Sequence, residues 1–373
     1  MRTLVLSCNT GAGHNSCALA VQESFLAHGE TCDIADALEF ISEKASQFVS
    51  NWHTRIYRHA PKLFGSGYQG AEHHDDLFRE GTLLYKCITA GAERLYEFIL
   101  SGDYGSIICT HVFPALALTE IRRRCPTAAF YASHISTDYT CSPCTADSKL
   151  DCYFIPAASL ADEFAACGIP RGKLVPSGIP VRRAFYEHCP LPEGKARMGL
   201  DPQHRHLLMM CGSMGCGPME ELAGCLCGRL SGSQELTVIC GTNESLCGKL
   251  QKQYGQQPRV HIYGTVDNVP QLMQSADLFL TKPGGLSTTE AMTARLPMVL
   301  IDAVAGCEEP NLNYFLRNDM AVTAGTPEAV ADTALELLDD ESRLCGMRAA
   351  MAACTPIPSS EIIYEWIRNH AGK

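Results

Sequence analysis

The chain has 373 residues, of which 46% are hydrophobic, and its formal net charge is −11. This length suits two domains of ordinary size, and the apolar fraction is enough to build a core in each. The negative charge argues against nucleic-acid binding. No apolar run approaches the roughly 18 residues that a membrane span needs. The opening run "MRTLVLSCNT" is typical of a strand rather than of a signal peptide, so we expect a cytoplasmic protein.

The sequence predicts no bound metal and no cofactor. Its twenty cysteines stand in a long chain without a secretory signal, which favours reduced thiols, many of them in apolar segments. Cys141, Cys144 and Cys152 lack a convincing fourth zinc ligand. No D-x-D motif occurs, so clustered carboxylates for a divalent cation are also missing from the sequence.

Short apolar or β-branched runs alternate with helical segments along the chain. In the first half these runs lie at 3–7, 31–36, 106–112, 128–133, 152–156 and 173–178. In the second half they lie at 206–212, 236–241, 259–264, 277–285 and 297–302. Such alternation predicts an α/β protein with parallel sheets covered by helices on both faces. We expect two Rossmann-like, doubly wound domains that face a shared cleft at the carboxyl ends of their strands.

The segment "VPSGIPVRRAFYE" at 175–187 places two prolines and a glycine within five positions, which is typical of a linker. We therefore expect an N-terminal acceptor-binding domain over 1–180 and a C-terminal domain over 181–355. The remaining residues, 356–373, contain one apolar helical face and are expected to pack back onto the body. That face consists of Ile362, Trp366 and Ile367.

A glycine-rich turn follows the first strand in "NTGAGHNS", Asn9–Ser16. His14 stands directly after Gly13, where a helix is expected to begin, on a turn that resembles a phosphate-binding loop. The helix itself is predicted from the spacing of Ala18, Val21 and Phe25, with Gly29 at its end. A histidine on such a loop is more often solvated than catalytic, so this turn alone does not establish an active site.

A second turn, "TKPGGLSTTEA" at 281–291, is the strongest local signal. Gly284 and Gly285 would let the backbone approach a ligand closely. A helix beginning near Ser287 would present free N–H groups to a diphosphate. Alternatively, Ser287 and Glu290 match the S-x-x-E capping box, which would explain Glu290 without any ligand.

A third glycine turn, "CGSMGCG" at 211–217, opens the second domain. It lacks the Lys-Ser/Thr ending of a P-loop and differs from the G-x-G-x-x-G dinucleotide signature. On its own it is weak evidence for a ligand. Its position at a strand-to-helix turn places it at the edge where ligands bind in such sheets.

The segment 48–68 is basic and aromatic and contains no acidic residue, in contrast with the acidic chain around it. Its basic and aromatic residues include Trp52, Arg55, Arg58 and Lys62. This composition suits an anionic membrane surface, where three cations contribute roughly 3 kcal/mol. Alternatively, the aromatics lie in the core and the cations are solvated. Arg122–Arg124 either add to this basic surface or end a helix near its negative terminus.

Several motifs together resemble one enzyme family. They are "GAGH", "STDY", "SGIPVRRAF", "CGTN", "YGTVDNVPQLM", "TKPGGLSTTEA" and "AGCEEPN". In this order and spacing they resemble the monogalactosyl- and glucosyl-diacylglycerol synthases, above all the bacterial processive diacylglycerol glucosyltransferases. That family is related to the peptidoglycan transferase that adds N-acetylglucosamine to a lipid-linked muramyl peptide. The resemblance implies a GT-B fold, work at the membrane surface, no bound metal and inversion of the anomeric centre.

The resemblance also implies roles for individual residues. His14, beside Gly13 on the acceptor side, matches the general base that takes a proton from the acceptor hydroxyl. Asp138 of "STDY" matches an acid on the first domain, and Glu290 matches the acid that holds the ribose hydroxyls. The other implied donor-binding residues are Gly212, Ser213, Gly215, Val266, Lys282, Pro283, Gly284, Gly285, Ser287, Thr288, Glu308 and Asn311.

Three positions depart from the family pattern. Ser142 and Thr145 replace a histidine and a tryptophan on the acceptor side, and Cys307 replaces a glutamine on the donor-sugar side. The resemblance implies a transferase that moves a hexose from a UDP-sugar to diacylglycerol or a glycosyl-diacylglycerol. It would act peripherally on the anionic inner face of the cell membrane. The alternatives are a catalytically retired GT-B protein that binds UDP-sugar or lipid, and a transferase with a polyprenyl-linked or soluble acceptor.

Overall fold

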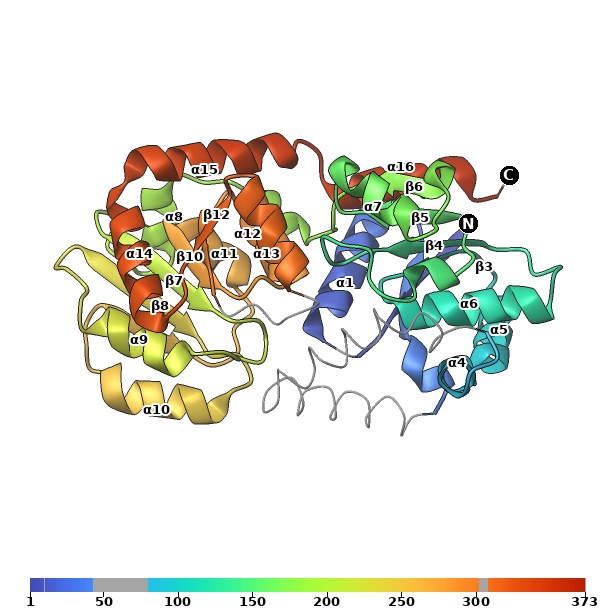
Figure 1. Cartoon of the computed structure of the whole chain (residues 1–373), viewed down its shortest axis with the longest axis horizontal. Helices are drawn as coiled ribbons and strands as arrows, with labels where there is room; N and C mark the ends of the chain where they lie inside the picture. The colour runs from blue at the N-terminus through green and yellow to red at the C-terminus, as the bar shows by residue number, and fades with distance from the viewer. Residues whose placement is uncertain (10, 43–79, 302–307, 373) are drawn as a thin grey trace. The chain divides into compact units, whose positions relative to one another are not determined.

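The computed structural model describes residues 1–9, 11–42, 80–301 and 308–372. The chain divides into two compact units (Figure 1). The first unit consists of Met1–Arg183, Ala305–Pro310 and Ile357–Lys373. The second consists of Ala184–Val304 and Asn311–Pro356.

The first unit contains a six-stranded parallel sheet with the order β2-β1-β3-β4-β5-β6. Its strands are β1 (Arg2–Ser7), β2 (Cys32–Asp36), β3 (Tyr104–Cys109), β4 (Tyr131–Ile135), β5 (Cys152–Ile155) and β6 (Leu174–Pro176). The helices are α1 (Ala12–Ala27), α4 (Leu83–Ile88), α5 (Ala92–Ser101), α6 (Val112–Arg124), α7 (Ala161–Ala166) and α16 (Ser359–His370). Apolar side chains on one face of the sheet pack against α5, α6 and α7, and those on the other pack against α1 and α16.

The helix α16 closes the core of the first unit although it comes last in the chain. It buries Ile363, Tyr364 and Ile367. The buried face of this helix differs from the predicted face, because Ile362, which was expected on it, is only half-buried. Trp366 packs against the edge of the core, and its indole N–H donates to the Tyr131 hydroxyl at 3.1 Å.

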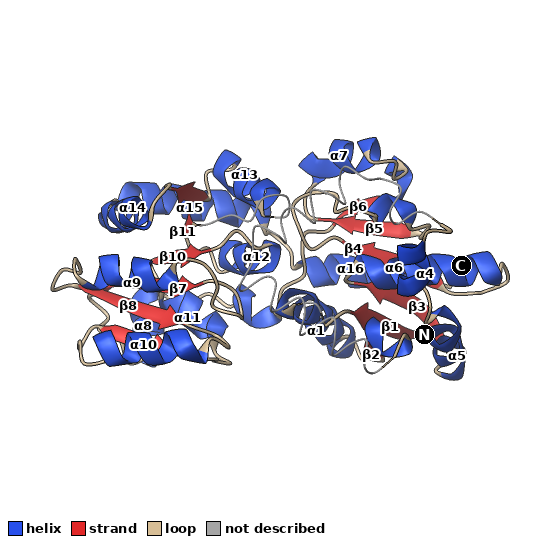
Figure 2. Cartoon of the chain, turned by 60° about the horizontal axis from the view of Figure 1, so that its bottom comes forward, coloured by secondary structure: helices blue, strands red, loops and turns tan. Residues whose placement is uncertain are grey.

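The second unit repeats the architecture with the strand order β12-β11-β10-β7-β8-β9, again all parallel. Its strands are β7 (Arg205–Met210), β8 (Gln234–Ile239), β9 (Val260–Tyr263), β10 (Leu278–Thr281), β11 (Met298–Leu300) and β12 (Ala321–Thr323). The helices are α8 (Leu191–Arg197), α9 (Met219–Cys227), α10 (Glu244–Tyr254), α11 (Val269–Ser275), α12 (Gly285–Thr293), α13 (Glu309–Arg317), α14 (Pro327–Asp339) and α15 (Glu341–Cys354). Helices cover both faces of each sheet (Figure 2).

The predicted fold class is confirmed, and each of the eleven predicted apolar runs overlaps a strand. Parallel strands are buried on both faces, so their sequences are continuously apolar and easy to recognise. The strand β12 was missed, although it matches the predicted β6 in having three residues, one of them exposed.

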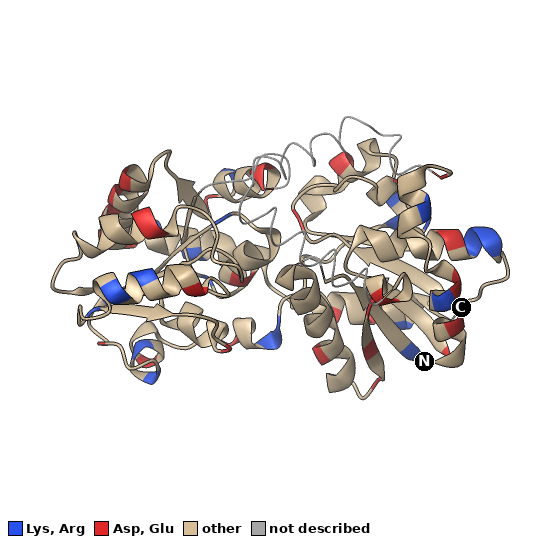
Figure 3. Ribbon diagram, turned by 90° about the horizontal axis from the view of Figure 1, so that it is seen from below, with Lys and Arg blue, Asp and Glu red and all other residues tan. Residues whose placement is uncertain are grey.

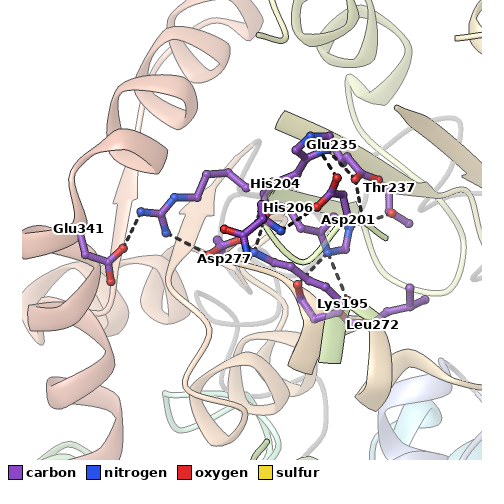
Figure 4. Close-up of polar contacts among 12 residues, drawn as sticks. Lys195, Asp201, His204, His206, Glu235, Thr237, Leu272, Asp277 and Glu341 are labelled. Carbon is purple, nitrogen blue, oxygen red and sulfur yellow. Dashed lines mark hydrogen bonds and ion pairs between the residues drawn. The ribbon is translucent and has the colours of Figure 1, made fainter. Parts of the chain in front are cut away.

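A buried ionic network fixes the amino-terminal edge of the second sheet (Figure 4). The Lys195 ammonium lies 2.7 Å from a carboxylate oxygen of Asp277, and both side chains are at most 5% exposed. Arg205 reaches Asp277 at 3.2 Å and Glu341 at 2.8 Å, so the network joins α8, β7, β10 and α15. Removing one member of such a pair leaves a buried charge and costs about 3–5 kcal/mol. Because ligands bind at the opposite, carboxyl edge, this network belongs to the scaffold.

Charged residues of both signs occur in each unit (Figure 3). Arg122–Arg124 form the last turn of α6, where cations favour the helix dipole. Arg122 pairs with Asp151 at 2.5 Å, and Arg123 and Arg124 pair with Glu120 at 2.8 and 2.6 Å. These contacts favour the helix-end role over a free basic surface. None of the described helices combines the length and apolar character that crossing a bilayer requires.

Candidate active site

His14 lies in the first turn of α1, three residues after the N-cap Gly11. Its Nδ1 is 2.7 Å from the backbone carbonyl oxygen of Thr110. A carbonyl oxygen only accepts hydrogen bonds, so Nδ1 carries the proton. In the neutral ring, Nε2 is then the unprotonated nitrogen and can act as a base.

The main chain holds Thr110 in place, and so it sets the direction of the His14 ring. The Thr110 N–H donates to the Leu6 carbonyl at 3.0 Å and continues the pairing of β1 with β3. The Thr137 hydroxyl lies 3.4 Å from the same Nδ1 on the loop after β4. The tautomer is therefore set where the ends of three strands meet.

Burial lowers the pKa of the His14 imidazole below its ordinary value, and the hydrogen bond to Thr110 offsets only part of this effect. The positive end of the α1 dipole also disfavours a charged ring. His14 is consequently neutral near pH 7, the state that a general base requires.

Two other histidines lie beside His14, and the sequence analysis missed both. The His111 ring meets the His14 ring edge to face at 4.7 Å, and its Nδ1 accepts from the Phe113 N–H at 3.1 Å to cap α6. His134 is 4% exposed in β4, and burial together with His14 lowers its pKa to about 3. Their position at the carboxyl ends of two predicted strands, the edge where ligands bind, could have identified them from the sequence.

The structure describes only some of the other residues predicted for the acceptor side. Gly13 occupies the second position of α1, and Asp138 is half-buried on the loop that also carries Thr137. Thr145, at one of the positions that depart from the family pattern, is 1% exposed. The remaining predictions, Trp52, Arg55, Arg58, Lys62 and Cys307, lie outside the described residues.

Most of the predicted donor residues of the second unit lie after β7 and β10, which are neighbours in the sheet. Val266 follows β9 instead, and Asn311 lies in α13. One expectation about the donor residues was wrong, because α12 begins at Gly285 and not near Ser287. Gly284 is the N-cap, so Ser287 is the third helical residue and Glu290 lies in the helix interior. The capping-box alternative therefore fails, since it needs Ser287 at the N-cap.

The first turn of α12 is open. Gly284 has φ −72° and ψ 135°, a conformation that any residue adopts, and among the described atoms none lies within 4 Å of where its Cβ would stand. Neither its backbone nor a described neighbour thus requires glycine. As the N-cap, Gly284 supplies no side-chain acceptor to the first N–H groups of the helix. Such a turn is suited to an anion that approaches the backbone closely.

The residues around this turn differ in how far they are buried and in whether they are already hydrogen-bonded. Ser287 is half-buried, whereas Thr288 is fully buried and its hydroxyl donates to the Gly284 carbonyl at 2.9 Å. Asn311 is fully buried and donates to the Pro283 carbonyl at 2.9 Å, which ties α13 to the turn. Lys282, Pro283 and Glu290 are also buried, and Val266 is half-buried just before α11. Glu308 belongs to the first unit, where it is buried.

The turn after β7 contains three glycines with positive φ: Gly212 at 65°, Gly215 at 56° and Gly217 at 87°. Residues other than glycine rarely adopt a positive φ, so the geometry of this turn accounts for its three glycines. Ser213 is exposed between the first two glycines. Among the residues that the structure describes, no group of three His, Cys, Asp or Glu side chains could hold a metal ion.

Comparisons with known proteins match two families along the chain. Residues 14–181 match the family Monogalactosyldiacylglycerol (MGDG) synthase. Residues 228–353 match the family Glycosyl transferases group 1.

Two curated relatives carry the same name, processive diacylglycerol beta-glucosyltransferase. The protein from Bacillus subtilis (strain 168) is 24% identical over 371 residues, which cover 98% of this chain and 94% of the relative. The protein from Staphylococcus saprophyticus is 30% identical over 270 residues, which cover 70% of this chain and 66% of the relative.

Solved structures share the fold. MurG from Acinetobacter baumannii superposes with a TM-score of 0.62 at 12% identity, and the match covers 99% of both chains. HepE from Anabaena, solved in complex with UDP and glucose, superposes with a TM-score of 0.58 at 13% identity and covers 100% of both chains. At such identities the likeness shows a GT-B fold and nothing further.

Proposed function

Because the chain belongs to the family of monogalactosyldiacylglycerol synthases and processive diacylglycerol glucosyltransferases, and is a glycosyltransferase with the GT-B fold, we propose the following reaction. The protein moves a hexose from a UDP-sugar to diacylglycerol or a glycosyl-diacylglycerol. The anomeric centre inverts, and no metal ion takes part.

His14 is the general base in this proposal. As the acceptor hydroxyl oxygen bonds to the anomeric carbon, the bond from that carbon to the UDP oxygen breaks and UDP leaves. Nε2 of His14 takes the hydroxyl proton. The observation that carries this role is the 2.7 Å contact between Nδ1 and the Thr110 carbonyl, which leaves Nε2 unprotonated. Attack opposite the leaving group gives inversion, and Asp138 lies on the neighbouring loop as a further acid of the acceptor side.

The second unit holds the donor in this proposal. The open first turn of α12 offers its N–H groups to the diphosphate, and Gly284 leaves room for it. The helix dipole then offsets charge that a metal would otherwise neutralise. Glu290 holds the ribose hydroxyls, and Ser213 on the β7 turn adds an exposed hydroxyl.

The acceptor is assigned from the relatives, whose names specify diacylglycerol. The basic and aromatic composition of 48–68 supports peripheral binding to an anionic membrane surface. In this assignment residues 1–180 bind the acceptor and residues 181–355 bind the UDP-sugar.

The test is an activity screen of UDP-sugars against lipid acceptors in vesicles, read by UDP release and by mass spectrometry of the extracted lipids. We expect a hexosyl-diacylglycerol product that requires His14 and persists in EDTA. Comparing neutral with phosphatidylglycerol-rich vesicles tests the membrane surface. UDP binding without turnover on diacylglycerol, polyprenyl-linked or soluble acceptors would identify a retired transferase. Turnover on a soluble acceptor alone would exclude the lipid assignment.

A further inference from the structure

Two turns of the second unit are interlocked at the carboxyl edge of the sheet. They are the β7 turn, Gly212–Gly217, and the β8 turn, Gly241–Asn243, which follow adjacent parallel strands. A Cβ on Gly215 would collide with the carbonyl oxygen of Cys240, and a Cβ on Gly241 would collide with the carbonyl oxygen of Ser213. Both glycines have positive φ, so the close approach and the backbone conformation require glycine together.

Asn243 joins the two turns through its side-chain amide. Its Nδ2 donates to the Gly215 carbonyl at 3.0 Å, and its Oδ1 accepts from the Leu246 N–H at 3.1 Å. The first partner only accepts and the second only donates, so the orientation of the amide is determined. A third tie runs from the Thr242 N–H to the Ser213 carbonyl at 2.9 Å.

The amide does more than begin a helix. Asn243 is the N-cap of α10, and this role needs only a side-chain oxygen, which aspartate or serine would also supply. The hydrogen bond from Nδ2 to Gly215 is additional. Within the β7 turn, the Gly215 N–H reaches the Gly212 carbonyl only at 3.4 Å, a long and weak contact. The shape of the β7 turn therefore depends on the β8 turn.

We propose that Asn243 is a positioning residue for donor binding, holding the β7 turn in the shape in which Ser213 and the turn backbone meet the UDP-sugar. This inference rests on the proposed function, because it requires that the β7 turn binds the donor. Asn243 itself acts through Gly215 and needs no contact with the nucleotide.

The experiment compares Asn243→Asp and Asn243→Ser with Thr326→Ala in the full chain. Both variants keep an oxygen that caps α10. An ionised aspartate has no donor for the Gly215 carbonyl, and the serine hydroxyl stands one bond nearer the main chain than Nδ2 does. Thr326 caps α14 through the Ala329 N–H in the same unit and serves as the matched control for a lost cap. Calorimetry gives the UDP dissociation constant, kinetics give KM for the donor and kcat, and hydrogen exchange reports on the amides of 212–217.

For both Asn243 variants we expect a melting temperature near that of the unaltered chain and faster exchange in 212–217. The UDP dissociation constant and donor KM should rise roughly 3- to 10-fold, as the loss of one hydrogen bond implies. Thr326→Ala should lower the melting temperature without changing UDP affinity.

Two results overturn the inference. One is an unchanged UDP affinity in both Asn243 variants. The other is weaker UDP binding without faster exchange in the β7 turn. If the unaltered chain binds no UDP, the proposed function fails and the donor role of Asn243 falls with it. The exchange data then show separately whether the amide holds the turn.

Discussion

The β1–α1 turn of the first unit and the β10–α12 turn of the second share the order strand, glycine N-cap and helix, although the φ angles of the two glycines differ. Each follows a buried parallel strand, and each helix begins after a glycine N-cap, Gly11 or Gly284. At both glycines, no described atom lies within 4 Å of where a Cβ would stand. The third helical residue differs: it is His14 in α1 and Ser287 in α12.

The difference shows that the turn alone does not determine the chemistry. In the first unit the turn positions a side chain, and the neighbouring strand end orients it through the Thr110 carbonyl. In the second unit the third helical residue is Ser287, whose side chain is shorter than that of histidine. The turn there offers mainly its backbone N–H groups to a ligand. One turn is suited to moving a proton, and the other is suited to holding an anion.

The largest expected effect separates the two turns directly. His14→Ala should lower kcat by about 100- to 10,000-fold, the usual contribution of a general base. UDP affinity, measured by calorimetry, should stay unchanged. His28→Ala on the same helix is the control, because His28 lies at the exposed end of α1 beside Glu361. A His14→Ala variant with near-normal turnover would reduce His14 to a loop residue.

Glu290→Gln tests the second helix. Losing a hydrogen bond to a charged group should raise the UDP dissociation constant roughly 10- to 100-fold. Since the helix begins at Gly285, no capping box is lost with the charge. Glu336→Gln, an exposed change on α14, is the control. Reduced thermal stability with normal UDP affinity would mean that Glu290 serves the fold alone.

The pH dependence of turnover tests the protonation state of His14 in the first turn of α1. A base works only when unprotonated, and burial lowers the pKa of His14 from its ordinary 6.5. The rate kcat/KM should therefore be constant near pH 7 and fall only below pH 6.5, by about tenfold per unit below the pKa. The residual rate of His14→Ala should lack this acid limb. A limb centred above pH 7 would contradict an imidazole whose pKa is lowered below its ordinary value.

Gly284→Ala should have the smallest effect. The backbone at Gly284 suits alanine, so the change in stability should stay within about 1 kcal/mol. The added methyl group would stand where the diphosphate approaches, and UDP affinity should fall about fivefold. Gly346→Ala in α15, also without a described neighbour within 4 Å, controls for the substitution itself. Equal UDP affinity in both variants would show that the open turn is not used.

The sequence predicted most of the fold because its strands are buried on both faces. A run such as Leu207–Met210 has no alternative environment in a chain of this composition. The start of α12 was misplaced for a physical reason: paired glycines favour a turn, and Ser287 with Glu290 imitates a cap. The backbone of Gly285 is nevertheless helical, which no local pattern reveals.

The candidate site was predictable only in part. The motif around His14 was visible, whereas His111 and His134 become its neighbours only when β3 and β4 align beside β1. The same holds for Asn243, whose contact with Gly215 joins two strand ends. Contacts between strand ends depend on the order of the strands in the sheet, and this order cannot be predicted from any single segment of the sequence.

The position of α16 has a consequence for synthesis on the ribosome. The first unit contains the residues that are translated first, but its core includes Ile363, Tyr364 and Ile367. The second unit is complete once Pro356 has emerged. The unit begun first is thus finished last, and its apolar face stays uncovered while the whole second unit is being made. A truncation before Ser359 would be felt at α1, the helix whose first turn carries His14, and not in the unit that immediately precedes the cut.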